Sequence, residues 1–216
     1  MTIRVLCCGA VDAKKKKKKC SFATFREGLP YVYLPELEDD FCKELDAFQP
    51  DVIHVWGTEY GHSLAMVNAA RKTGRIDRLV VNIQGLCTMI ARHHNEGVPY
   101  AWQKTKSFRD FVRKDNLLQQ QEKFALRGEL EQQTLKGVKH VIGRTHWDRA
   151  CTQLINPEIV YHHCDETLRS PFYEDSWRYA ECKKHSIFAP GCSYPVKGFH
   201  YLLEAFAEVV KTYPDA

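Results

Sequence analysis

The sequence predicts an α/β protein built around a parallel β-sheet. Two apolar runs, Val52 to Trp56 and Leu79 to Ile83, are short, flanked by turn residues and composed like buried strands. Between them, residues Ser63 to Thr73 repeat apolar side chains at helical spacing and stop at Gly74. A strand, a helix and a second strand at this spacing predict a βαβ unit, in which the two strands run parallel.

The run from Val52 to Trp56 is expected to be a central strand, buried on both faces, because its apolar residues are nearly continuous. Polar side chains that can do chemistry, Thr58, Glu59, Tyr60 and His62, follow this strand directly. In open α/β sheets, ligands bind beyond the carboxyl ends of the strands. These residues are therefore the first candidates for a functional site.

The rest of the chain continues the alternation of strands and helices. Further strands are predicted at Ile3 to Cys8, Tyr31 to Leu34, Val138 to Ile142, Ile159 to His162 and Ser186 to Ala189. Further helices are predicted at Phe41 to Phe48, Leu117 to Leu135, His146 to Leu154 and Gly198 to Thr212. The helix from Leu117 lacks a strong apolar stripe, so we expect it to lie across the surface. Residues 92–111 are predicted to be irregular, and residues 172–177 to form a loop or a short helix.

Composition excludes several classes of protein. Hydrophobic residues make up 44% of the 216 residues and aromatic residues 12%, which is ordinary for a globular core. The nine cysteines are scattered without a C-x-x-C pair, which favours reduced thiols. No secretory signal and no membrane-spanning run is present in the sequence. We therefore expect a cytoplasmic protein, with contact to the inner face of a membrane as the alternative.

Lys14 to Lys19 form a block of six positive charges, and its meaning is open. It is a solvated loop, a polyanion-binding patch or an anomaly of the gene such as an expanded homopolymer, and the first or last of these is preferred because like-charge blocks are usually solvated. Removing the six lysines from the net charge of +4 leaves −2. A nearly neutral body argues against nucleic acid as a partner.

Four motifs in combination resemble family 4 retaining glycosyltransferases of the GT-B fold, most closely the bacterial enzymes of polysaccharide assembly. They are Pro50 to Glu59, Ile83 to Leu86, Gly143 to Asp148 and Tyr194 to Phe199. The resemblance extends from about Tyr31 to the end of the chain. It implies two Rossmann-like domains that face a cleft, and transfer of a sugar with retained anomeric configuration.

The resemblance implies a division of the chain into an acceptor-side domain over residues 1–183 and the beginning of a donor-binding domain over residues 184–216. The first domain has a degenerate first loop over residues 10–28, which offers only Gly9 where the family has a glycine-rich loop. One strand and one helix cannot bury their own apolar stripe. We therefore expect a fragment that is inactive alone.

The donor-binding residues that the resemblance implies are Lys197, Gly198 and Gly9. Lys197 matches the basic residue that contacts the donor diphosphate and offsets leaving-group charge. The arginine usual a few residues earlier is absent, and Cys192 stands near that place. The paired-glutamate motif that contacts the donor sugar would lie beyond Ala216.

The candidates for the acceptor side of the cleft are Glu59, His62, Gln84, Gly85 and Arg144. Glu59 and His62 either bind acceptor hydroxyls or donor phosphate, or are a loop carboxylate and a helix N-terminal residue without further role. Gln84 and Gly85 stand where many relatives carry a histidine near the reacting sugar. Glutamine can form hydrogen bonds but cannot act as a base, which agrees with a retaining mechanism that needs no enzyme base.

No metal and no cofactor are expected. His93, His94, His162, His163 and Cys164 have a spacing that fits no usual zinc-ligand pattern. A basic and aromatic stretch, residues 93–113, is interpreted as an acceptor-site or surface loop, with contact to a membrane-bound lipid-linked acceptor as the alternative.

The predicted function is that of a hexosyltransferase fragment. The intact enzyme is expected to transfer a sugar from a nucleotide-sugar to a glycan or a lipid-linked acceptor. One alternative is a non-catalytic α/β remnant or binding module of the same ancestry. Another is a nucleic-acid-binding protein that uses Lys14 to Lys19, for which strongly salt-dependent binding would be diagnostic.

Overall fold

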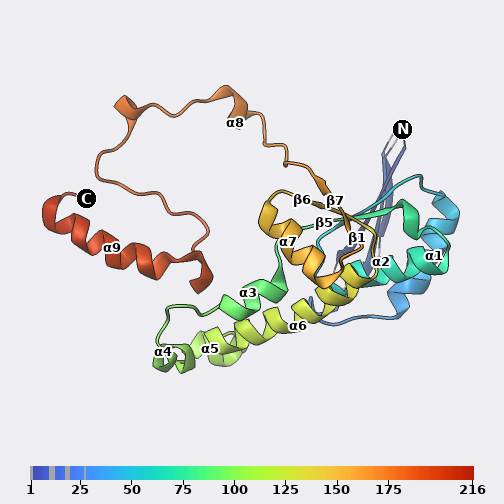
Figure 1. Cartoon of the computed structure of the whole chain (residues 1–216), viewed down its shortest axis with the longest axis horizontal. Helices are drawn as coiled ribbons and strands as arrows, with labels where there is room; N and C mark the ends of the chain where they lie inside the picture. The colour runs from blue at the N-terminus through green and yellow to red at the C-terminus, as the bar shows by residue number, and fades with distance from the viewer. Residues whose placement is uncertain (1, 10–12, 18–19, 27) are drawn as a thin grey trace. The chain divides into compact units, whose positions relative to one another are not determined.

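The structure is a computed structural model of the 216-residue chain, and it describes residues 2–9, 13–17, 20–26 and 28–216 (Figure 1). The chain divides into two compact units, Met1–Ala91 with Glu122–Cys164 and Arg92–Gln121 with Asp165–Ala216. The predicted boundary between residues 183 and 184 stays a prediction. Each unit is described by itself below.

The first unit contains a four-stranded sheet in which all strands run parallel. Its strands, in the order β4-β5-β6-β7, are β4 (Ile53–Trp56), β5 (Leu79–Asn82), β6 (His140–Gly143) and β7 (Val160–His163). The connecting helices are α2 (Gly61–Lys72), α3 (Cys87–His93), α6 (Leu117–Lys136) and α7 (His146–Ile155), with the short 3₁₀ turn η1 (Ile76–Arg78) before β5. The predicted α/β class, the parallel sheet and the βαβ unit are confirmed. The sheet is compatible with a Rossmann-like fold.

β4 is an edge strand of this sheet, so the prediction of a central strand buried on both faces is wrong. Ile53 and Val55 are buried, whereas 55% of Trp56 is exposed. An apolar run does not reveal on how many sides a strand has neighbours. The predicted first strand, β1 (Ile3–Gly9), is confirmed, but it pairs with another segment and not with β4.

That other segment belongs to a separate three-stranded sheet of the order β1-β3-β2, in which β2 is Ala13–Lys17 and β3 is Cys20–Arg26. β1 runs parallel to β3, and β2 runs antiparallel to it. Residues 13–17 and 20–26 form strands, so the prediction of a degenerate loop over residues 10–28 is wrong there. The reason lies in β3, where Ala23 and Phe25 are buried and Phe22 is exposed, an alternation typical of a strand. The meaning of the lysine block stays open, and Lys18 and Lys19 lie outside the described residues.

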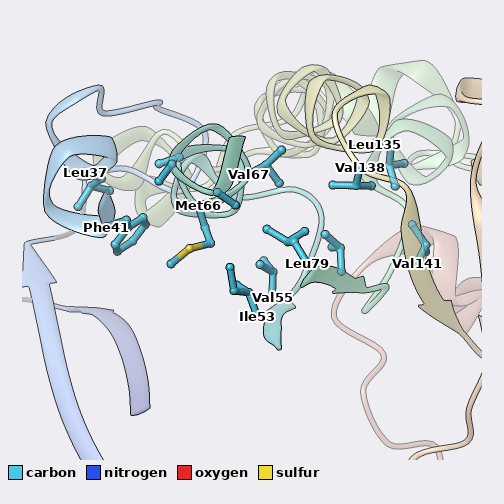
Figure 2. Close-up of a cluster of buried hydrophobic side chains, with 14 of the residues drawn as sticks. Leu37, Phe41, Ile53, Val55, Met66, Val67, Leu79, Leu135, Val138 and Val141 are labelled. Carbon is cyan, nitrogen blue, oxygen red and sulfur yellow. The ribbon is translucent and has the colours of Figure 1, made fainter. Parts of the chain in front are cut away.

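The core is formed by the four-stranded sheet, the helices packed against it and β3 of the three-stranded sheet, whose Phe25 packs edge-to-face on Phe41. Because the strand order follows the chain order, right-handed crossovers bring the connecting helices to the same face. α1 (Glu36–Phe48) joins them, and Figure 2 shows its side chains and those of α2 pointing toward the strands. The labelled core residues are Leu37, Phe41, Ile53, Val55, Met66, Val67, Leu79, Leu135, Val138 and Val141. Each fully buried aliphatic side chain of this kind stabilises the fold by about 1.5–3 kcal/mol.

Two further predictions about the first unit need correction. Residues 31–34 form no strand, but a turn and extended chain that lead into α1. The C-terminal half of α6 does not lie on the surface: it buries Leu130, Glu131 and Leu135. The periodicity of apolar residues missed this face, because glycine, glutamate and threonine share it with leucine.

The second unit consists of short helices joined by irregular chain. It contains the helices α4 (Tyr100–Lys104), α5 (Phe108–Arg113), α8 (Pro171–Glu174) and α9 (Phe199–Thr212) and the 3₁₀ turns η2 (Tyr179–Glu181) and η3 (Pro195–Lys197). The predicted helix near the C-terminus is confirmed. The strand predicted at Ser186 to Ala189 is wrong, because these residues are irregular, and residues 92–111 are more helical than expected. Among the described residues, none of the helices could cross a membrane.

Candidate functional site

The candidate site begins at the carboxyl end of β4, where the chain turns into α2. Gly57 follows the strand with a φ of 95°, a conformation that glycine adopts without strain. Its N–H donates to the carbonyl of Asn82 on β5 at 2.9 Å. This turn places residues 58–60 at the edge of the sheet where the parallel strands end.

An ion pair joins this turn to α6. Arg127 donates from Nη2 to Oε1 of Glu59 at 2.8 Å. The Glu59 side chain is only 5% exposed and that of Arg127 is 20% exposed. The other Glu59 oxygen accepts from the backbone N–H of Thr58 at 2.9 Å. Glu59 is therefore placed to hold Arg127, and Arg127 is the member of the pair that reaches solvent.

A second carboxylate, Glu131, lies fully buried one turn further along α6. It accepts from the backbone N–H groups of Cys87 at 2.9 Å and Thr88 at 3.0 Å, at the start of α3. Thr58 donates from Oγ1 to the same carboxylate at 3.1 Å. Burial raises the pKa of Glu131, and the hydrogen bonds from Thr88, Cys87 and Thr58 oppose that rise. Through these buried hydrogen bonds, Glu131 on α6 connects the turn after β4 with the start of α3.

Two titratable groups beside the ion pair, the Cys87 thiol and the Tyr60 hydroxyl, have raised pKa values and are neutral in the physiological pH range. Burial raises the pKa of the Cys87 thiol to about 12, so Cys87 is not a nucleophile. Burial also raises the pKa of the Tyr60 hydroxyl, and the neighbouring Glu59 carboxylate adds to the effect. The Arg127 guanidinium lies 5.0 Å from the centre of the Tyr60 ring, a cation–π distance.

His62 stands in the first turn of α2, half-buried. Its ring stacks on that of Tyr60, with 5.1 Å between the centres and 8° between the planes. The two rings lie parallel to each other, and the Arg127 guanidinium lies near the Tyr60 ring. An aromatic face and a cation are groups that can bind a ligand together.

Gln84, Gly85 and Arg144 lie at the carboxyl ends of the next two strands. Gln84 donates from Nε2 to Oδ1 of Asn82 at 2.9 Å. Arg144 follows β6, and its Nη2 lies 3.5 Å from the carbonyl of Gln84. A side chain at Gly85 would find only Ile90, at 3.6 Å, so this turn has free space. The structure therefore brings the predicted acceptor-side candidates to one edge of the sheet.

The predicted donor-side residues lie elsewhere in the chain. Gly9 ends β1 in the three-stranded sheet. Lys197 is exposed at the end of η3, and Gly198 precedes α9 with a φ of 74°. Both of these belong to the second compact unit. Their roles stay predictions.

Sequence reasoning missed Arg127 and Glu131, which organise the site from α6. Gly128 stands between them in the helix, and a side chain there would meet Thr88 Cα at 3.0 Å. The close approach of α3 to α6 therefore requires glycine at this position. In the sequence, Gly128 stands among good helix formers, with Glu131 three residues later. This pattern could have indicated a close helix contact at this position.

Among the described residues, no group of three or more histidine, cysteine, aspartate or glutamate side chains is placed to hold a metal ion. His140 and His162 form a hydrogen bond with 3.1 Å between Nδ1 and Nε2. They line a shallow hollow of about 470 Å³ that includes none of the acceptor-side or donor-side candidates.

Comparison with known proteins adds nothing to this geometry. No protein-family model, no curated protein and no solved structure matches the chain. The functional argument therefore depends on the residues themselves.

Proposed function

We propose that the first unit is the acceptor-side domain of a family 4 retaining glycosyltransferase of the GT-B type, and that it binds a glycan at the carboxyl edge of its parallel sheet. The observation that carries the proposal is the position of Glu59, Gln84 and Arg144 just beyond three neighbouring parallel strands. This edge is where α/β proteins bind their ligands. The motif resemblance supports the same assignment.

The chemistry of the edge suits a sugar. A pyranose has apolar C–H faces and a rim of hydroxyl groups. The stacked rings of Tyr60 and His62 offer an aromatic face, and Arg127, Gln84 and Arg144 offer hydrogen-bond donors. Arg127 Nε is buried and has no hydrogen-bond partner among the described residues, so a sugar would contact the exposed part of this side chain instead.

The two carboxylates have positioning roles in this proposal. Glu59 holds Arg127 against the aromatic rings, and Glu131 fixes Thr58 and the start of α3. Neither serves as a general base, since both are buried and already paired. Gln84 cannot take a proton either. A retaining transfer in which the donor phosphate accepts the proton needs no such base from this domain.

On the donor side, the proposal assigns the diphosphate contact to Lys197, with Gly198 allowing close approach of the backbone. A lysine ammonium binds phosphate oxygens through charge-assisted hydrogen bonds and stabilises the leaving group. The nucleotide-sugar is a substrate here, and the proposal includes no cofactor.

A binding module of the same ancestry is the second candidate function. The observation that favours it is that both buried carboxylates already have protein partners: Glu59 pairs with Arg127, and Glu131 accepts from the backbone N–H of Thr88. Neither carboxylate is therefore free to react. Such a module would bind glycans without transferring a sugar. The two candidates share the same binding edge and differ in turnover.

Saturation-transfer NMR tests the shared claim. The purified chain is mixed with maltotriose, cellotriose or triacetylchitotriose, and we expect transfer to the ring protons of at least one of them. Arg127→Met should abolish the transfer. Arg71→Met, which changes an exposed arginine near the C-terminal end of α2, far along the helix from His62, should preserve it. Absence of transfer to every oligosaccharide would contradict the proposal.

Turnover separates the two candidates. Release of nucleoside diphosphate from UDP-glucose, UDP-N-acetylglucosamine or GDP-mannose is measured with and without the oligosaccharide that binds. Release that depends on Lys197 supports the transferase and contradicts the expectation that the chain is inactive alone, whereas binding without release is expected both of the module and of a transferase fragment.

A further inference from the structure

The helices α4 and α5 of the second unit carry a cluster of exposed apolar side chains. On α4, Tyr100 is 61% exposed and Trp102 is 69% exposed. On α5, Phe108, Phe111 and Val112 are 85%, 74% and 63% exposed. With aromatic side chains of 150–250 Å² each, the four rings alone leave roughly 500 Å² of apolar surface open, a size that marks interaction sites.

The apolar side chains of α5 lie on one face of the helix. Phe108, Phe111 and Val112 are spaced three and four residues apart, so they share a stripe. The helix starts with a capping box: Ser107 accepts from the backbone N–H of Asp110, and the Asp110 carboxylate accepts from the N–H of Ser107. These local hydrogen bonds stabilise the short helix, whose apolar side chains are exposed to solvent.

Positive charges flank this apolar face. Five exposed cations stand between residues 104 and 114: Lys104, Lys106, Arg109, Arg113 and Lys114. In the part of the chain that the structure describes, none of them forms an ion pair. The single carboxylate of residues 100–114, Asp110, is used in the capping box. The segment therefore has a strong excess of positive charge next to its apolar surface.

We propose that residues 100–114 form a docking surface for anionic lipid membranes. The apolar face of α5 and the Trp102 ring would enter the boundary between headgroups and acyl chains, and the five cations would contact lipid phosphates. Amphipathic helices that lie in the membrane interface have this arrangement, with aromatic residues on one face and Lys or Arg beside it. Each cation near an anionic surface adds to the affinity.

Two other partners fit these residues less well. Single-stranded nucleic acid binds to aromatic rings interleaved with cations, whereas α5 gathers its apolar side chains, Val112 among them, on a continuous face. A protein partner would have to be strongly acidic and apolar at once. An anionic bilayer supplies both properties. The inference does not depend on the proposed glycosyltransferase function.

Vesicle co-sedimentation tests the proposal. The full chain is incubated with vesicles of phosphatidylcholine that contain about one third phosphatidylglycerol, and with vesicles of phosphatidylcholine alone. We expect binding to the anionic vesicles and at least tenfold weaker binding to the neutral ones. Arg109→Gln with Arg113→Gln should weaken binding by roughly 25-fold, since each near-surface cation contributes about fivefold. Lys183→Gln with Lys184→Gln, a matched pair of exposed lysines in the same unit, should change it less than threefold.

The apolar face has its own control. Phe108→Ser with Phe111→Ser should reduce binding at least tenfold, while Phe172→Ser with Tyr173→Ser, a pair of exposed aromatics on α8, should leave it unchanged. All of these side chains are exposed, and circular dichroism checks that each variant is folded. Insertion is read from tryptophan fluorescence, whose blue shift on binding should disappear in Trp102→Phe.

The lysine block requires a separate arm, because six lysines can attract anionic vesicles by themselves. A background in which Lys14 to Lys19 are all serine should retain binding and its dependence on Phe108 and Phe111. The proposal is overturned by loss of binding in that background, by equal binding to neutral vesicles or by the absence of binding. Tighter, salt-dependent binding to an oligothymidine that the same variants abolish would overturn it in favour of a nucleic-acid surface.

Discussion

Replacing Arg127 by methionine removes the only cation that pairs with Glu59 in the described structure, while methionine retains much of the packing of the arginine stem. The Glu59 carboxylate, 5% exposed, then keeps the hydrogen bond from the Thr58 backbone N–H at 2.9 Å and a longer one from the Thr58 hydroxyl at 3.5 Å, but no cation. Breaking a buried ion pair costs about 3–5 kcal/mol, and because the Arg127 side chain is 20% exposed we expect water to reduce the loss to about 2–3 kcal/mol.

Urea unfolding followed by circular dichroism measures this loss as a change in the free energy of unfolding. Glu59→Gln in the Arg127→Met background removes the orphaned charge and should restore about 1–2 kcal/mol, which a double-mutant cycle reports as coupling. Arg71→Met serves as the control: it removes an exposed hydrogen bond from Arg71 to the Gly137 carbonyl at 3.0 Å, with an expected change below about 1 kcal/mol. A loss in Arg127→Met no larger than in Arg71→Met, or an absence of coupling, would refute the role assigned to the ion pair.

Three further predictions concern the surroundings of this pair. Burial raises the pKa of Glu131 in the folded protein above its unfolded value, so the stability of the wild type relative to Glu131→Gln should fall as the pH rises from about 4 to about 7; urea unfolding across this range tests it, and a rise would contradict it. The Cys87 thiol, with a pKa raised to about 12, should react with iodoacetamide at about pH 8 far more slowly than exposed Cys164; equal rates in mass spectrometry of the native protein would show that Cys87 is accessible as thiolate. Gly128→Ala should destabilise by about 1–3 kcal/mol, because the added methyl group meets backbone atoms of Thr88; a neutral substitution in urea unfolding would show that α3 and α6 approach less closely.

The parallel sheet could be predicted from the sequence because each of its strands is a short apolar run followed by a turn. The run at Val52 to Trp56 gave the type of the element but not its neighbours, and β4 is an edge strand. Strand order depends on contacts between distant segments, which local patterns do not record. The pairing of β1 with β3 was not predicted from the sequence. The alternation of buried and exposed residues in β3 was overlooked because it follows directly after the lysine block.

The part of the candidate site that follows the strands could be predicted from local sequence patterns, whereas the part on α6 could not. Glu59, Gln84 and Arg144 stand directly after strands, and the rule that ligands bind at the carboxyl edge finds such residues. Arg127 and Glu131 stand in the middle of a polar helix, far from any strand end. Only the packing of α6 against β4 and α3 brings them to the edge, through Thr58 and Cys87.

Amide chemical-shift mapping tests the central claim, that a glycan binds at the carboxyl edge of the sheet, most directly. The backbone of ¹⁵N-labelled protein is assigned, and the oligosaccharide that shows saturation transfer is titrated in. We expect the perturbed amides to cluster at residues 57–62, 84–86 and 143–145, and residues 140 and 162 beside the shallow hollow to stay unchanged. Perturbations centred on the hollow or spread over the second unit would contradict the claim.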